Sequence, residues 1–179
     1  IVAVHAAGAA TGGLPYYTMP FVDGETLRQR LARGGALPVQ EAVHLLREVA
    51  DALAYAHHQG VAHRDVKPAN ILLAAGHALV ADFGVAKALG ASTRTGGGGG
   101  HTTPTDSAIT VPGFALGTPA YMAPEQALGD PAADHRVDIY AFGVVAYEAL
   151  SGRVPFSATT LQALLAAHVN ETPPPVRTL

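Results

Sequence analysis

The stretch HRDVKPAN, residues 63–70, guides the interpretation of the whole sequence. It places the carboxylate of Asp65, two cationic side chains and the carboxamide of Asn70 close together, and Pro68 stiffens the chain between them. This spacing suits a short loop that directs one acid at a proton and one amide at a metal ion or a phosphate. The stretch therefore predicts a loop that carries out chemistry.

Two further motifs follow in order. Asp82-Phe83-Gly84 begins 17 residues after Asp65, and GTPAYMAPE covers residues 117–125. An apolar segment, DIYAFGVVAYE, follows at residues 138–148. In this order and spacing, the motifs resemble the large lobe of a eukaryotic-like (bacterial Hanks-type) serine/threonine protein kinase. We judge chance agreement of the whole set to be negligible.

The resemblance implies an α+β, protein-kinase-like fold that is mainly the helical C-terminal lobe. We expect residues 1–19 to be the end of the small lobe, 20–24 the hinge and 25–179 the large lobe, with an activation segment at 82–125. The glycine-rich loop, strand lysine and helix glutamate of such kinases are not found in this sequence, nor are the final helices of the lobe. We therefore expect a partial catalytic domain, with little kinase activity from these residues alone.

Composition favours a folded enzyme domain and excludes several other classes. The 179 residues are 49% hydrophobic and 14% charged, with a net charge of −3 and no basic run, so no nucleic-acid partner is expected. The absence of cysteine excludes disulfides and thiolate metal sites. The longest apolar helix candidate is too short to span a bilayer. We expect a cytoplasmic domain, leaving open an anchor elsewhere in the parent protein and kinase dimerisation.

The catalytic roles come from the resemblance. It implies that Asp65 is the catalytic base, that Lys67 places a cation near the migrating phosphoryl group, and that Thr118 hydrogen-bonds to both. Asn70 and Asp82 are the implied ligands of Mg²⁺, which prefers oxygen donors. The expected substrates are ATP and a protein with serine or threonine hydroxyls.

The resemblance also implies nucleotide-binding and regulatory residues. Met19 is the expected gatekeeper, Pro20 and Val22 the hinge contacts to adenine, and Leu72 the residue beneath the ring. Arg64 is the expected partner of an activation-loop phosphate, for which Thr110 is the preferred acceptor. Other candidate acceptors are Thr103, Thr105 and Ser107.

Local patterns predict the first half of the chain. Strands are expected at residues 1–4 and 16–22, joined by a turn at Gly12-Gly13. Thr26-x-x-Gln29 predicts a capping box for a helix ending at Gly34-Gly35. Pro38 is expected to open a second helix that ends near Gly60. Its predicted buried stripe comprises Val39, Val43, Leu46, Val49, Ala50 and Leu53.

The second half is expected to begin with a hairpin of residues 71–74 and 78–81 that turns at Gly76 and holds Asn70 and Asp82 at its two ends. Residues 87–116 lack periodicity and predict a loop. Helices are expected at residues 124–128, 137–150 and 159–169. The second of these is apolar on nearly every face, so Asp138 at its start is explained only if it accepts hydrogen bonds there.

Three alternatives remain. His57, His58 and His63 could form a zinc site, although adjacent residues on a helix point about 100° apart. An aminoglycoside-type phosphotransferase shares the spacing of Asp65 and Asn70, but Arg64, Lys67 and residues 117–125 argue against it. A pseudokinase or interaction module is the remaining alternative, although Asp65, Asn70 and Asp82 are all present.

Overall fold

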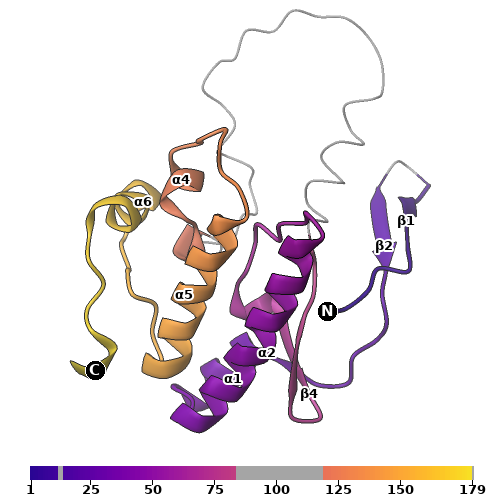
Figure 1. Cartoon of the computed structure of the whole chain (residues 1–179), viewed down its shortest axis with the longest axis horizontal. Helices are drawn as coiled ribbons and strands as arrows, with labels where there is room; N and C mark the ends of the chain where they lie inside the picture. The colour runs from indigo at the N-terminus through magenta and orange to yellow at the C-terminus, as the bar shows by residue number, and fades with distance from the viewer. Residues whose placement is uncertain (12–13, 84–118, 179) are drawn as a thin grey trace, which may run out of the picture.

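The computed structural model describes residues 1–11, 14–83 and 119–178, and it has the predicted α+β architecture. Two antiparallel sheets, β1-β2 and β3-β4-β5, accompany the helices. In Figure 1, α2 and α5 run side by side through the centre. The strands are β1 (Ala6–Ala9), β2 (Pro15–Thr18), β3 (Glu25–Thr26), β4 (Ile71–Ala74) and β5 (His77–Val80). The α-helices are α1 (Leu27–Gly34), α2 (Val39–His58), α4 (Pro124–Ala127), α5 (Arg136–Ser151) and α6 (Leu161–Asn170). Short 3-10 turns are η1 (Pro68–Asn70), η2 (Pro119–Tyr121) and η3 (Val176–Thr178).

The N-terminal strands differ from the prediction. Residues 1–4 are not a strand, although the Val2 N–H donates to the Val80 carbonyl at 2.8 Å. β1 forms at Ala6–Ala9 instead, and β2 ends at Thr18 rather than at residue 22. Pro20 lacks the N–H that a paired strand needs, which accounts for the early end. The turn predicted at Gly12-Gly13 lies outside the described residues.

The first helix agrees with the sequence. The Thr26 side chain accepts a hydrogen bond from the Gln29 N–H, and the Gln29 side chain accepts from the Thr26 N–H, so the capping box is confirmed. The helix ends at Gly34, and Gly35 has a φ of 65°, which glycine adopts at little cost.

The second helix has the predicted length but a different buried face. Pro38 is its N-cap and Val39 its first residue. Val39 and Val43, which were predicted to be buried, are 67% and 58% exposed. Val49 and Leu53 are buried as predicted, together with Ala42, Leu45 and Ala56.

The bounds of the hairpin strands and of the last helices agree with the prediction to within two residues. β4 pairs with β5 through a turn at Ala75-Gly76, where both residues have positive φ. α5 is the buried central helix, and Gly152 ends it with a φ of 78°. The loop predicted at residues 87–116 lies outside the described residues. No helix in the described part of the chain is long and apolar enough to cross a membrane.

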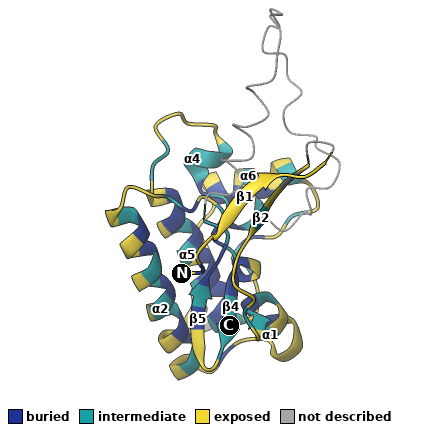
Figure 2. Ribbon diagram, turned by 90° about the vertical axis from the view of Figure 1, so that its right-hand side faces the viewer, coloured by how far each residue is buried: buried dark blue, intermediate teal, exposed yellow. Residues whose placement is uncertain are grey.

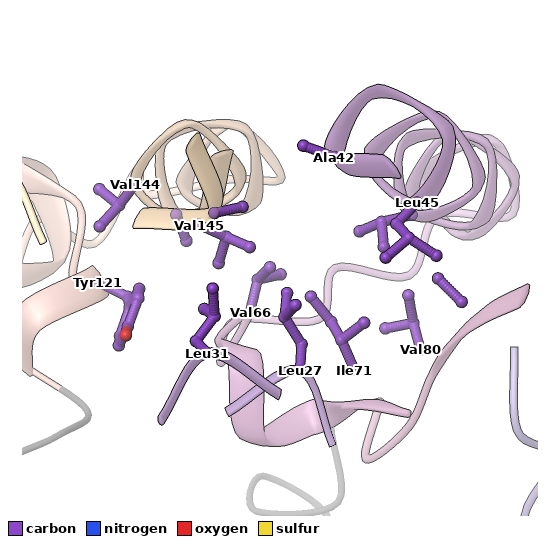
Figure 3. Packing of buried hydrophobic residues seen from close by; sticks show 14 of the residues in the cluster. Leu27, Leu31, Ala42, Leu45, Val66, Ile71, Val80, Tyr121, Val144 and Val145 are labelled. Atoms are coloured by element: carbon purple, nitrogen blue, oxygen red, sulfur yellow. The ribbon is translucent and has the colours of Figure 1, made fainter. Parts of the chain in front are cut away.

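The main hydrophobic core joins α1, α2, α5 and the β4–β5 hairpin (Figure 3), and Leu164 and Ala167 of α6 form a second, smaller cluster with Phe156. Leu27 and Leu31 of α1 pack between α5, α2 and the β4–β5 hairpin. Two buried residues flank residues 67–70: Val66 is 2% exposed and Ile71 is 1% exposed. The core therefore fixes the candidate catalytic loop from both ends. Figure 2 shows that β1 and β2 are largely exposed and lie outside this core.

Candidate active site

Asp138 of α5 holds the start of the loop at residues 63–70. Its side chain is fully buried and accepts hydrogen bonds from the His63 N–H at 2.7 Å and the Arg64 N–H at 2.6 Å. His57 Nε2 lies 2.7 Å from the same carboxylate. These contacts confirm that Asp138 accepts hydrogen bonds at the start of its helix. They also stabilise Arg64, whose φ of 66° is unusual for a residue other than glycine.

His63 connects the loop to the end of β5. Its Nδ1 accepts a hydrogen bond from the Asp65 N–H at 3.2 Å, so its Nε2 carries the proton that is donated to the Ala81 carbonyl at 2.8 Å. The ring packs against Phe83 with centroids 4.6 Å apart. His63 is 1% exposed and therefore positions the loop without contacting solvent.

Two predicted catalytic residues, Lys67 and Asn70, contact Asp65 directly. Lys67 Nζ lies 2.6 Å from Asp65 Oδ2. Asn70 Nδ2 donates to the Asp65 carbonyl at 2.8 Å and to Oδ2 at 3.1 Å. Because its amide nitrogen is engaged with Asp65, Asn70 has its Oδ1 oxygen to offer to a cation.

Asp82 is brought to the same place by the hairpin. The Ala81 N–H donates to the Asn70 carbonyl at 2.9 Å, so the residues before β4 and after β5 are neighbours. Asp82 has a φ of 63°, and its Oδ1 accepts a hydrogen bond from the Tyr17 hydroxyl at 2.6 Å. This hydrogen bond, with burial, raises the pKa of Tyr17. The oxygen donors of Asn70 and Asp82 are the type of ligand that Mg²⁺ prefers, so the donor set fits that ion.

A pocket opens beside Asp65 on the side of α4. Arg64 is exposed at its rim, and Gln126 of α4 donates to the Arg64 carbonyl at 3.3 Å. The residues that line the pocket are Arg64, Asp65, Val66, Tyr121, Met122, Gln126, Val137 and Ala141. The pocket therefore lies between the candidate catalytic loop and the segment from Tyr121 to Gln126.

The predicted nucleotide-binding residues occupy two segments. Met19 and Pro20 are exposed and Val22 is half-buried, in the connection from β2 to β3. Leu72 is half-buried in β4, where it pairs with Thr26 of β3. Because Thr26 is only four residues after Val22, its pairing with Leu72 places the end of the β2–β3 connection next to the β4–β5 hairpin.

Thr118 and Thr110 lie outside the described residues, as do Thr103, Thr105 and Ser107.

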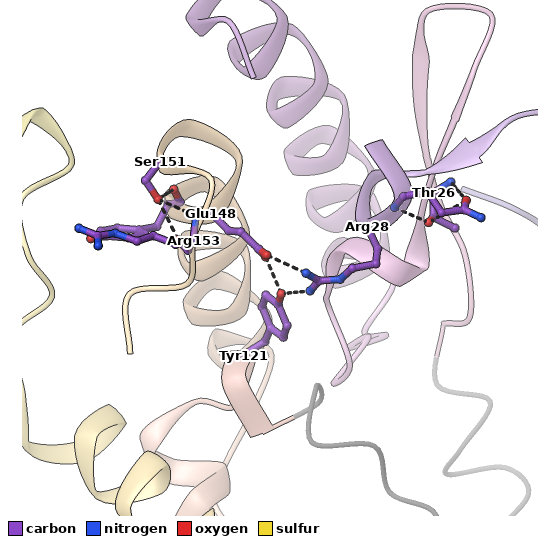
Figure 4. Close-up of polar contacts among 8 residues, drawn as sticks. Thr26, Arg28, Tyr121, Glu148, Ser151 and Arg153 are labelled. Atoms are coloured by element: carbon purple, nitrogen blue, oxygen red, sulfur yellow. Dashed lines mark hydrogen bonds and ion pairs between the residues drawn. The ribbon is translucent and has the colours of Figure 1, made fainter. Parts of the chain in front are cut away.

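A polar cluster that was not predicted from the sequence joins α1, η2 and α5 (Figure 4). Arg28 of α1 donates to Glu148 of α5 at 2.7 Å and to the Tyr121 hydroxyl, and this hydroxyl also donates to Glu148. Burial, followed by the hydrogen bond to Glu148, raises the pKa of Tyr121. The available signal was Glu148 itself, a lone acid in an apolar helix, because a buried charge requires partners.

The structure does not support the zinc alternative at His57, His58 and His63. His57 contacts Asp138 while the His63 ring faces Ala81 and Asp65.

The contact between Tyr17 and Asp82 was not predicted, since no sequence pattern connects residues 65 positions apart.

Comparison with known proteins agrees with this site and fold. The family model described as "Protein kinase domain" matches residues 11–176, so the chain belongs to the protein kinase domain family. The chain is 40% identical to the serine/threonine-protein kinase PknB of Mycobacterium leprae (strain TN) and of Mycobacterium tuberculosis (strain ATCC 25618 / H37Rv), over 98% of its own length. It is 38% identical, over the same share of its length, to the serine/threonine-protein kinase PknA of Mycobacterium tuberculosis (strain ATCC 25177 / H37Ra). It spans 26% of the length of these PknB relatives and 38% of that of PknA.

Proposed function

We propose that this chain provides the phosphoryl-transfer site of a serine/threonine protein kinase. The observation that carries the proposal is the direct contact of Asp65 with both Lys67 and Asn70, beside Asp82. In the proposed reaction, a serine or threonine hydroxyl oxygen bonds to the γ-phosphorus of ATP while the bond from that phosphorus to ADP breaks. The hydroxyl proton passes to the Asp65 carboxylate.

Each neighbour of Asp65 has a separate role in this proposal. Both described contacts of the carboxylate fall on Oδ2, which fixes its orientation and directs Oδ1 towards the incoming hydroxyl. Lys67 supplies positive charge next to the transferred group. Asn70 Oδ1 and the Asp82 carboxylate would hold Mg²⁺, which when bound neutralises charge on the phosphates. Tyr17 must then release one Asp82 oxygen or share it.

The remaining predicted residues complete the proposal. Met19, Pro20, Val22 and Leu72 would surround adenine, and Thr118 would hydrogen-bond to Asp65 and Lys67. Arg64 would bind a phosphate on Thr110, because a guanidinium forms charge-assisted hydrogen bonds with phosphate. Phosphopeptide mapping of active protein tests this last role. A map without modification between residues 92 and 118 would exclude it.

The function is tested in a chimaera. The start of a relative's kinase domain, with its glycine-rich loop and strand lysine, is joined ahead of this chain at the matching position. We expect radiolabel from γ-labelled ATP to appear on serine and threonine of a protein substrate. Label on aminoglycosides instead would favour the small-molecule phosphotransferase, and an inactive but folded chimaera would favour the pseudokinase. The 179-residue chain alone is expected to transfer little label.

A further inference from the structure

Two histidines and a glutamate meet on the surface, away from the candidate active site. His44 and Glu48 lie one turn apart on α2 and therefore share a face of that helix. His77 begins β5, immediately after the turn of the β4–β5 hairpin. This turn is at the opposite end of the hairpin from Asn70 and Asp82.

The separations of the ligand atoms suit a single metal ion. His77 Nδ1 lies 2.6 Å and His44 Nε2 3.7 Å from Glu48 Oε1, and one ligand atom from each of the three residues lies within 4.8 Å of the others. With metal–ligand distances of about 2.0–2.2 Å, a tetrahedral zinc site separates its ligand atoms by roughly 3.4 Å. Side-chain rotations that move the ligand atoms by less than about 1.5 Å therefore complete the geometry without moving the backbone.

A second layer of contacts already orients the carboxylate. Glu48 Oε2 accepts a hydrogen bond from the Ala78 N–H at 2.6 Å, which directs Oε1 towards the two imidazoles. This backbone hydrogen bond, followed by that of His77, lowers the pKa of Glu48 and keeps it ionised. Metal-binding carboxylates are typically held in this way by a group outside the coordination sphere.

An ion pair of Glu48 with one histidine and the contact of His44 with the Gly76 carbonyl are the simpler explanation, but neither requires both imidazoles to lie at the same carboxylate oxygen. An exposed pair contributes little to stability, and Glu48 needs only one histidine to form it. His44, which is 57% exposed in its side chain, nevertheless places its Nε2 3.3 Å from the Gly76 carbonyl and beside Glu48. Both imidazoles therefore present a nitrogen to the same oxygen.

We propose that His44, Glu48 and His77 form a site for a divalent transition metal, with Zn²⁺ as the preferred ion and water as the fourth ligand. Two imidazoles and one carboxylate form a typical ligand set for zinc, whereas Mg²⁺ and Ca²⁺ prefer oxygen donors alone. Cu²⁺ and Ni²⁺ are competitors because they also bind imidazole strongly. Binding needs the lone pairs of His44 Nε2 and His77 Nδ1, so the Nε2 contact with Gly76 is given up and acid weakens the site.

The bound ion would connect α2 to the hairpin turn. The hairpin carries Asn70 and Asp82 at its other end, so the site stabilises the element on which the candidate active site is built. This proposal does not depend on the proposed kinase function, because binding is measured without ATP or substrate.

The test is titration calorimetry with zinc chloride on the tag-free, metal-stripped 179-residue chain. We expect one Zn²⁺ to bind per chain and the melting temperature to rise with zinc concentration. His44→Ala and His77→Ala should each weaken binding by about 100-fold or more, since loss of a ligand costs at least as much as loss of an outer-shell partner. His58→Ala is the matched control, because His58 is an exposed histidine of α2 outside the cluster, and it should bind as the wild type does.

The outcomes separate clearly. The substituted histidines are exposed, and circular dichroism of each variant verifies that it folds. Absence of saturable binding in the folded wild-type chain would overturn the proposal. Equal affinity in wild type and His77→Ala would overturn it too, because binding would then occur elsewhere.

Discussion

Asp138 is the single residue on which the position of the candidate catalytic loop most depends. The N–H groups of His63 and Arg64 donate to different oxygens of Asp138, and Asp138→Asn replaces one of these oxygens with an NH2 group, so one of the two N–H groups loses its acceptor. We expect a loss of about 1–3 kcal/mol in the free energy of unfolding, which is the usual cost of a buried donor without a partner. Urea denaturation measures it.

Asp134→Asn is the control for this substitution. Asp134 is half-buried with its side chain 45% exposed, and its ion pair with Arg136 is at the surface. The expected loss is below about 1 kcal/mol. Equal stability of Asp138→Asn and the wild type would show that the loop does not need this anchor.

His168 of α6 predicts a dependence of stability on pH. It is 4% exposed, its Nδ1 lies 2.8 Å from the Tyr140 hydroxyl, and burial lowers its pKa, opposed by a backbone contact with Ala120. The unfolded chain therefore binds a proton more readily than the folded chain. We expect the free energy of unfolding to fall as pH decreases below about 6.5, the ordinary pKa of histidine, and to level off below the folded pKa.

Urea denaturation between pH 7.5 and 5 tests this dependence. His168→Phe should flatten the pH profile, whereas substitution of the exposed His58 should leave it unchanged. A wild-type profile that His168→Phe does not alter would assign the effect to other groups.

At the scale of elements, Tyr121 connects α1 to α5 through Arg28 and Glu148. Tyr121→Phe keeps the buried ring and removes only the hydroxyl. We expect a loss of about 1–2 kcal/mol, because Glu148 loses a donor but keeps Arg28. Adding Arg28→Ala should then cost more than it does in the wild type, since Glu148 would be buried without either partner. A double-mutant cycle measures this coupling, and additive effects would contradict it.

The helices show which parts of the fold a single sequence determines. The capping box at Thr26 and the glycine ends at Gly35 and Gly152 are local features, and the capping box and the end at Gly35 were predicted. The buried face of α2 is not local. Apolar residues occupy so many positions of α2 that the helical period does not determine which face of its first two turns is buried. The small Ala42, rather than Val43, faces the core.

At the scale of the whole molecule, stability should be unevenly distributed. All four residues of β1 are exposed, and β1 pairs only with β2 in the described sheet. An isolated two-stranded ribbon is marginally stable. We expect amide hydrogens of β1 and β2 to exchange at least about 100-fold faster than those in the middle of α5. Hydrogen–deuterium exchange with mass spectrometry measures this, and equal protection would show that the ribbon is part of the main cooperative unit.

The candidate site was predictable wherever short motifs carry it. Asp65, Lys67 and Asn70 lie within one loop, and the hairpin that brings Asp82 beside them is visible as two apolar runs around Gly76. Contacts between distant segments were not predictable. Tyr17 with Asp82, and His77 with Glu48, depend on tertiary packing that no local pattern records.

The rate of phosphoryl transfer after loss of the Asp65 carboxylate tests the account most directly. In the chimaera described above, Asp65→Asn keeps the shape of the side chain but removes the proton acceptor. The account predicts that kcat falls by about 10²–10⁴-fold, the usual contribution of a general base, while Asp51→Asn on the exposed face of α2 leaves it unchanged. An Asp65→Asn chimaera that transfers phosphate at the wild-type rate would contradict the account.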